Sequence, residues 1–233
     1  MGKRVVILQS NYIPWKGYFE LIHRADVFCF YDEVQYTKND WRNRNKILGP
    51  NGLFWITVPV EKEAVKGKIS EAKVTNYDWQ EKHFRTIEQT YSKALNRNAI
   101  LELLEPIYLS ERWDNISKLN QLLIEKLAKH IGINTIIKNS ADYQLKDERL
   151  AKLVDLIKQL DGSEYLSGPN AKNYLSENES IFSDNDIQLT YMNYGPYLEY
   201  ENKRKTFDHQ TSILDVLMNV PKEEYLNYIT SQT

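Results

Sequence analysis

Short apolar runs of strand length alternate with amphipathic stretches along most of this chain. Runs rich in β-branched and aromatic residues predict buried strands at residues 5–8, 27–30, 135–137 and 186–192, with a brief one before Ser167. Apolar residues three and four apart predict helices within residues 18–22, 78–94, 98–107, 116–131 and 150–160. Because strand, helix and strand recur, we predict an α/β fold with a mostly parallel central sheet, helices on both faces and right-handed crossovers.

Two insertions into this pattern are expected. Residues 49–52, Gly-Pro-Asn-Gly, form a turn signal between two β-prone runs and predict a hairpin insertion near residues 45–60. A polar stretch follows and leads into a short predicted strand at residues 69–74. The helices of residues 78–131 are predicted to form a helical subdomain that covers one edge of a cleft. The whole chain, residues 1–233, is predicted to be one domain.

Composition narrows the classes of function. With 30 basic and 32 acidic residues the formal net charge is −2, so no overall field favours nucleic acid. The one cysteine, Cys29, lies in an apolar run, where we expect a small buried hydrophobe and neither a disulfide nor a cysteine-based zinc site. No stretch reaches the roughly 20 apolar residues of a membrane span or resembles a signal peptide, so we expect a cytoplasmic protein. No cofactor or metal is predicted, because the sequence has no matching motif.

Polar side chains gather after the first two predicted strands. The first strand is followed by Gln9, Asn11, Tyr12 and Trp15. The second is followed by Asp32, Gln35, Tyr36 and Lys38. In parallel α/β sheets, ligands bind outside the carboxyl ends of the strands. We therefore predict that both loops contribute to a binding site; polar loops with packing aromatics are the alternative.

Cationic residues follow at alternate positions. In a strand, Arg42, Arg44 and Lys46 would share one face and could bind a phosphate or carboxylate, with the arginines acting bidentately. The alternative is a solvated edge strand, where cations are common. A second anion site is predicted where Ser167 and Gly168 open onto a short helix, because free N–H groups point there. Tight turns also use these residues for steric reasons alone.

Three residues are the candidates for acid–base chemistry: His83, His209 and Asp32. A histidine can act as a general base near neutral pH, and this hypothesis predicts that His83→Ala abolishes turnover with little change in the thermal midpoint. The alternative for His83 is a half-buried helical residue. His209 could be oriented by Asp215, although a helix cap plus a surface charge would explain the same two residues.

Several of these segments resemble the WbqC-like family of bacterial proteins. The resemblance lies in the loop after the first strand, in GYFELI, YDEVQY and WRNRNKI, in Tyr77, Trp79, His83 and Tyr91, in YLSG, and in FDHQTSILDVLMN. It extends over nearly the whole chain. The resemblance implies a setting in surface-polysaccharide (O-antigen) gene clusters and nucleotide-sugar chemistry, and it supplies no catalytic residues.

Three functions remain open at this point. The first is a transferase that modifies a nucleotide-linked sugar, for instance by acylating an amino sugar. The second is a nucleotidyltransferase-like enzyme, because QSNYIPWKGYF occupies the place of that superfamily's glycine-ended loop, although the superfamily's two histidines are missing. The third is a non-catalytic binding or scaffold protein of a polysaccharide assembly. The expected partner is a small molecule such as a nucleotide-sugar, without nucleic acid, and a homo-oligomer stays open.

Overall fold

The protein is described here from a computed structural model, which covers residues 2–202 and 207–232. Five parallel strands form the central sheet in the order β5-β2-β1-β6-β7. Their bounds are β1 Lys3–Leu8, β2 Val27–Phe30, β5 Ile136–Asn139, β6 Gly162–Ser167 and β7 Gln188–Tyr191. The predicted α/β class with a parallel sheet is therefore confirmed.

Side chains of the two central strands alternate between two hydrophobic cores. Val6 of β1 lies opposite Phe28 of β2 in register, and both face the larger core. Val5 and Ile7 face the smaller core on the other side, together with Cys29. Successive strand residues point to opposite faces, so near-continuous apolar runs are what a sheet covered on both sides requires. Cys29 is fully buried, as the sequence predicts.

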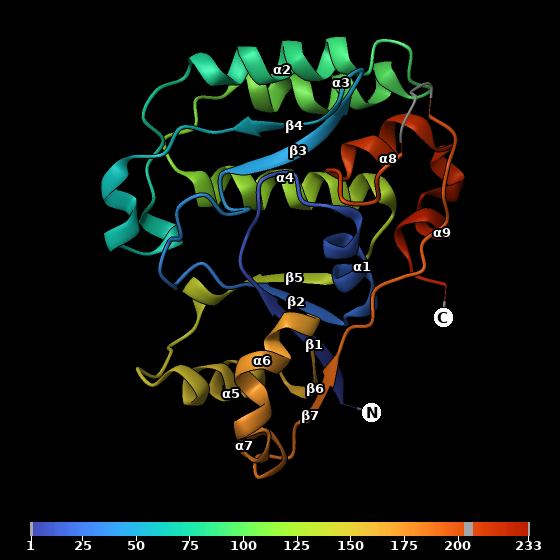
Figure 1. The fold of residues 1–233 in the computed structure, drawn as a ribbon. Coiled ribbons are helices and arrows are strands. Elements are labelled where there is room, and N and C mark those ends of the chain that lie inside the picture. Colours follow the sequence, from blue (N-terminus) through green and yellow to red (C-terminus); the bar gives the residue numbers. More distant parts are fainter. Residues whose placement is uncertain (1, 203–206, 233) are drawn as a thin grey trace.

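Helices cover both faces of this sheet (Figure 1). The helices are α1 Lys16–Arg24, α2 Asp78–Thr90, α3 Arg97–Glu105, α4 Ile116–Ile131, α5 Arg149–Gln159, α6 Lys172–Leu175, α7 Ser180–Ser183, α8 Leu214–Asn219 and α9 Tyr225–Ile229. Leu153 and Leu156 of α5 and Phe182 of α7 pack on the smaller core. The larger core holds α1 to α4 and the C-terminal helices. Within residues 2–202 and 207–232, no helix has the length and apolar character needed to cross a bilayer.

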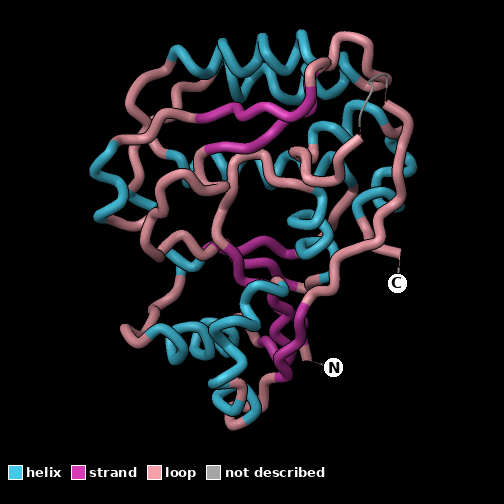
Figure 2. The backbone as a smooth tube through the Cα atoms, viewed as in Figure 1, coloured by secondary structure: helices cyan, strands magenta, loops and turns pink. Residues whose placement is uncertain are grey.

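The predicted hairpin is present as β3 Arg44–Gly49 and β4 Gly52–Thr57. It lies between α4 and the pair α2 and α3, outside the central sheet, as the tube in Figure 2 also shows. Gly52 adopts a positive φ of 105°, which explains the glycine at this turn. The first strand of the hairpin, β3, begins at Arg44. Arg42 therefore lies in the preceding turn and does not share a strand face with Arg44 and Lys46 as predicted.

The segment before α2 differs from its prediction. Residues 69–71 form a 3-10 turn rather than a strand, and the strand-like contacts in the predicted range are two isolated bridges, Val60 with Val74 and Lys73 with Asn115. Ile69 is buried against the larger core, so its side chain packs without any strand. Residues 78–131 hold α2, α3 and α4, and a π-helical turn at Pro106–Ser110 lies between α3 and α4.

Candidate functional site

A cleft of about 1020 Å³ opens at the carboxyl ends of β1, β2 and β6. Gln9 and Asn11 from the loop after β1, Glu33 from the loop after β2, and Ser167 at the end of β6 all line it. Counted along the chain, the sheet order is 3-2-1-4-5, so the order reverses between β1 and β6. Ligands of open parallel sheets bind at this reversal point. The loops that the sequence singles out therefore meet where this fold places its ligands.

Arg42 is the most firmly held cation of the cleft. One end of its guanidinium donates to Asn11 Oδ1, and the other donates to Gln9 Oε1 at 3.2 Å. The carboxylate of Asp40 lies 3.9 Å away. Only 14% of the Arg42 side chain is exposed, and its Nε–H has no partner. Neutral amides accept its hydrogen bonds and the Asp40 carboxylate balances only part of its charge from 3.9 Å, so Arg42 can still pair with an anionic ligand.

The backbone around Arg42 is fixed as well. Asn120, a buried residue of α4, donates its side-chain N–H to the carbonyl of Arg42 at 2.7 Å. The neighbouring Trp41 carbonyl accepts from the backbone N–H of Tyr12 at 2.9 Å. Asn45 of β3 donates to the carbonyls of Tyr12 and Ile13 at 3.1 and 2.8 Å. The loop after β1 and the turn before β3 are thus a single hydrogen-bonded unit.

The facing wall comes from α5 and α6. Arg149 and Lys152 of α5 line the cleft, and the Arg149 guanidinium lies 4.8 Å from the ring centroid of Tyr174. The amides at the start of α5 are occupied by the Glu148 side chain, so this wall offers side-chain charge and not helix N–H groups. Neither Arg149 nor Lys152 is part of a motif that stands out in the sequence. Their position in the first turn after a polar loop was the available signal.

Two carboxylates of the cleft have perturbed pKa values. Burial raises the pKa of Glu33, but hydrogen bonds from Lys68 and Ser70 outweigh it and hold the pKa below its usual value. Burial acts in the same way on Asp40, where the Thr37 hydroxyl and Arg42 bring the pKa below its usual value. Both groups are therefore charged at neutral pH.

Asp32 lies beneath the cleft and does not line it. It is 1% exposed and accepts hydrogen bonds from the backbone and hydroxyl of Ser10, from Ser117 and from Gln121. These donors occupy both oxygens and connect the loop after β1 to α4. The placement favours a positioning role for Asp32 and gives no support to the catalytic hypothesis.

His83 also lies outside the cleft lining, in the larger core. Its Nδ1 lies 2.8 Å from the Tyr12 hydroxyl, which in turn lies 2.5 Å from the Tyr108 hydroxyl. Burial, with the charge of Lys82, lowers the pKa of His83 to about 4. Tyr12 is fully buried in this cluster, so it holds the loop after β1 instead of meeting a ligand directly. The contacts described for His83, with Tyr12 and Trp79, include no residue that lines the cleft.

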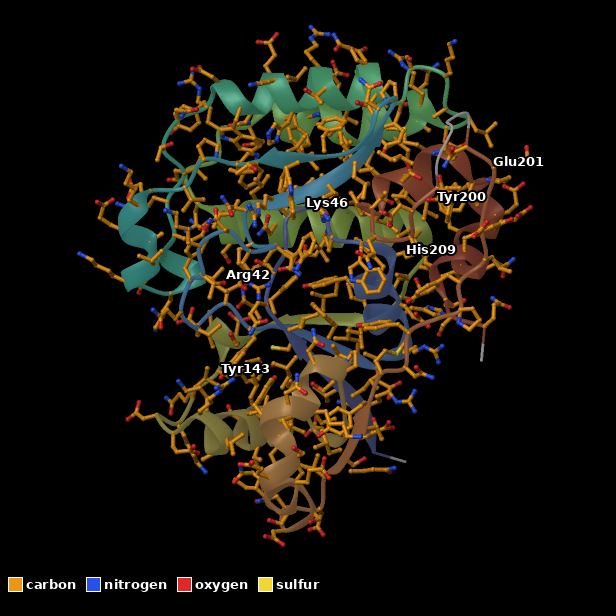
Figure 3. All side chains as sticks on the ribbon, viewed as in Figure 1. Arg42, Lys46, Tyr143, Tyr200, Glu201 and His209 are labelled. Carbon is orange, nitrogen blue, oxygen red and sulfur yellow. The ribbon has the colours of Figure 1, made fainter. Side chains whose placement is uncertain are left out.

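His209 lies on the α1 and α8 side of the molecule, away from Arg42 (Figure 3). Its Nδ1 is 2.6 Å from Nζ of Lys16, the first residue of α1. Burial lowers the pKa of His209, and burial lowers that of Lys16 to about 8. Asp215, the predicted partner of His209, accepts a hydrogen bond from Tyr200 at 2.7 Å. His209 is not among the residues that line the cleft.

The remaining predicted binding residues divide into two groups. Trp15, Ser167 and Gly168 line the cleft with Gln9, Asn11 and Arg42. Tyr36 is buried, Lys38 is exposed outside the lining, and Arg44 and Lys46 lie on the hairpin. The helix expected after Gly168 is a 3-10 turn and the four-residue α6, too short for the predicted anion site. Within residues 2–202 and 207–232 no cluster of His, Cys, Asp and Glu is placed to hold a metal.

Comparisons with known proteins place this geometry in a family. The model of the WbqC-like protein family matches residues 9–226. An uncharacterized protein of Mycobacterium tuberculosis is 44% identical over 232 residues, covering 97% of this chain and 98% of the relative. No solved structure matches the chain significantly. The match spans both walls of the cleft.

Proposed function

Because the chain belongs to the WbqC-like protein family, we propose that it binds a nucleotide-linked sugar in the cleft and transfers a group to that sugar during surface-polysaccharide (O-antigen) biosynthesis. One observation carries the proposal: Arg42, held by Gln9 and Asn11, lies at the point where the strand order reverses. Arg149 and Lys152 face it from the other wall. Cations on two sides of a cleft suit a diphosphate.

The cleft also supplies a group for the transfer step. Glu33 is a charged carboxylate that lines the cleft and is fixed by Lys68 at 2.8 Å. In this proposal an amino or hydroxyl group of the sugar attacks the acyl carbon of an acyl-CoA donor, the carbon–sulfur bond breaks and coenzyme A leaves as the thiolate, and Glu33 accepts the proton that the attacking group loses. The pair Trp15 and Tyr194, and Tyr174 on the wall that α6 forms, would pack on the sugar or the base.

The first test replaces the held arginine. Arg42→Gln should weaken the binding of a nucleotide-sugar about 10- to 100-fold, because a charge-assisted contact to phosphate is lost. Isothermal titration against UDP- and GDP-linked sugars measures this change. Arg42→Lys keeps the positive charge but loses the two-pronged guanidinium, so its affinity should lie between those of Arg42→Gln and the unchanged protein. Arg85→Gln on α2, where the side chain is 56% exposed, is the matched control and should bind normally. Equal affinities for Arg42→Gln and the unchanged protein would refute the assignment.

A second candidate, adenylyl transfer, is favoured by the strand order together with the loop and helix after β1. Thermal shifts with nucleotide-sugars, ATP and acyl-CoA separate the candidates. A ligand at 100 times its dissociation constant adds about 2.7 kcal/mol, or roughly 5–10 °C for a chain of this size. A response to ATP alone would favour adenylyl transfer, and no response to any of them would favour a binding or scaffold role.

A further inference from the structure

Two tryptophans are exposed side by side at the mouth of the cleft. Trp41, in the turn before β3, and Trp55 on β4 each have a relative exposure of 42%. Their ring centroids lie 5.3 Å apart with the planes inclined by 37°. Trp41 also lines the cleft, so the pair continues the cleft outward over the hairpin. An exposed pair of the largest aromatic side chains costs solubility and indicates a surface that meets a ligand.

Two cations flank this pair on the same face of the hairpin. Lys46 lies opposite Trp55 in register, with Nζ 5.1 Å from the ring centroid, and the Arg44 guanidinium lies 4.3 Å from it. In Figure 3 the labelled Lys46 lies on the hairpin, whereas Arg42 lies nearer the sheet. Among the residues that the structure describes, neither Arg44 nor Lys46 forms an ion pair. Arg44 also interacts with the charged carboxylate of Asp40, so an anion is attracted to the rings by Lys46 and by the part of the Arg44 charge that Asp40 leaves unbalanced.

We propose that Trp41, Trp55, Arg44 and Lys46, here called the tryptophan platform, bind a sugar ring that carries a carboxylate or phosphate group. The C–H face of a pyranose can pack on the indole of Trp41, while its anionic group pairs with Arg44 or Lys46. A flat nucleobase fits less well, because the rings are inclined and both cations occupy positions over Trp55. This platform is a subsite separate from the part of the cleft that Arg42 lines.

The platform extends the proposed function and partly rests on it. If the cleft holds the nucleotide-linked sugar, the platform holds a neighbouring acidic sugar, either of the donor or of the growing glycan. Arg42 contacts Gln9 and Asn11 inside the cleft, whereas Arg44 contacts Asn39 and Trp55 outside it. The two sites can therefore be tested independently.

The indole N–H signals of the five tryptophans provide the readout. The ¹⁵N-labelled full chain is titrated with an oligogalacturonate and with its methyl ester, which has the same rings without the charge. We expect the Trp41 and Trp55 signals, identified by Trp41→Phe and Trp55→Phe, to shift with the acid. The ester should bind about fivefold more weakly, because its pairing with Arg44 and Lys46 is lost. A titration with glucose 1-phosphate tests whether the platform binds a sugar that carries a phosphate. If it shifts the Trp41 and Trp55 signals, the sugar on the platform is assigned to the donor and not to the growing glycan.

Three variants complete the experiment. Arg44→Gln should weaken the binding of the oligogalacturonate about two- to fivefold. Arg42→Gln should leave the affinity for the oligogalacturonate unchanged. Tyr77→Ala is the matched control, because Tyr77 is also exposed, at 44%, with the Arg112 guanidinium 5.4 Å from its ring centroid. Equal binding of acid and ester, shifts confined to other tryptophans, or a Trp55 response to UMP would overturn the platform. If nucleotide-sugars fail to bind but the platform titration holds, the proposed function fails and the platform stands.

Discussion

Buried polar side chains hold the loop after β1 in its place. Asp32 fixes Ser10, and the pair His83 and Tyr108 fixes Tyr12, so Asn11 between them and Gln9 beside Ser10 are held where they contact Arg42. A polar group that leaves water needs such partners, since a buried polar atom without one costs about 1–3 kcal/mol. The chemistry that makes Asp32 and His83 attractive as catalysts is used here for positioning.

His83 should give the protein a measurable sensitivity to acid. Its folded pKa of about 4 lies below the value near 6.5 of the unfolded chain. Below pH 6.5 the unfolded chain therefore binds a proton that the folded protein refuses, and the free energy of unfolding falls by about 3 kcal/mol down to pH 4. Urea unfolding from pH 7 to pH 4 measures the fall. In His83→Gln, which cannot titrate, that part of the slope should vanish; parallel profiles would contradict it.

At the scale of elements, local patterns predicted the five strands of the central sheet, the hairpin and the long helices because those depend on periodicity and turn chemistry, whereas the strand predicted at residues 69–74 is absent. The ends of elements were less predictable. Arg42 reaches the cleft only because β3 begins two residues later, and that boundary depends on Asn120 and Asn45, which bind the neighbouring backbone. His83 is buried by Tyr12, 71 residues away in the sequence. Both contacts join residues that are far apart in the sequence, so neither can be predicted from a local sequence pattern.

The first turn of α1 shapes one wall of the cleft, and Gly17 is the residue that permits it. A Cβ at Gly17 would lie 2.3 Å from a ring carbon of Trp15, which packs on Tyr194 with centroids 5.0 Å apart. Gly17→Ala gains helix propensity but displaces the indole, so we expect a net loss of about 1–2 kcal/mol and weaker ligand binding. Urea unfolding and the near-ultraviolet spectrum measure both effects.

The control for that substitution is another glycine of the cleft. A Cβ at Gly168 would meet nothing within 4 Å, and its φ of −67° suits alanine. Gly168→Ala should therefore keep the stability of the unchanged protein. If both variants lose stability equally, the loss at Gly17 is not caused by the Trp15 ring.

At the scale of the whole molecule, Glu20 links α1 to the C-terminal segment of the described chain. Its carboxylate is fully buried and accepts from Arg24 at 2.7 Å, from the Ser231 backbone at 2.8 Å and hydroxyl at 2.6 Å, and from Tyr197 at 2.5 Å. Tyr197 also contacts Trp15, with ring centroids 6.0 Å apart. The C-terminal segment thereby supports the wall of the cleft on which α1 begins.

Removing this carboxylate should loosen both the C-terminal segment and the cleft. Glu20→Ala leaves the donors of Arg24, Tyr197 and Ser231 without their acceptor. We expect the free energy of unfolding to fall by about 3 kcal/mol, which is at the low end for a broken buried ion pair because the Arg24 side chain is 32% exposed. Ser231→Ala removes one hydroxyl alone and should cost about 1 kcal/mol. Hydrogen exchange in α9 should rise more in Glu20→Ala than in Ser231→Ala, and binding of a nucleotide-sugar should weaken in the same order. Unchanged exchange in α9 would show that apolar packing, and not Glu20, holds the segment against α1.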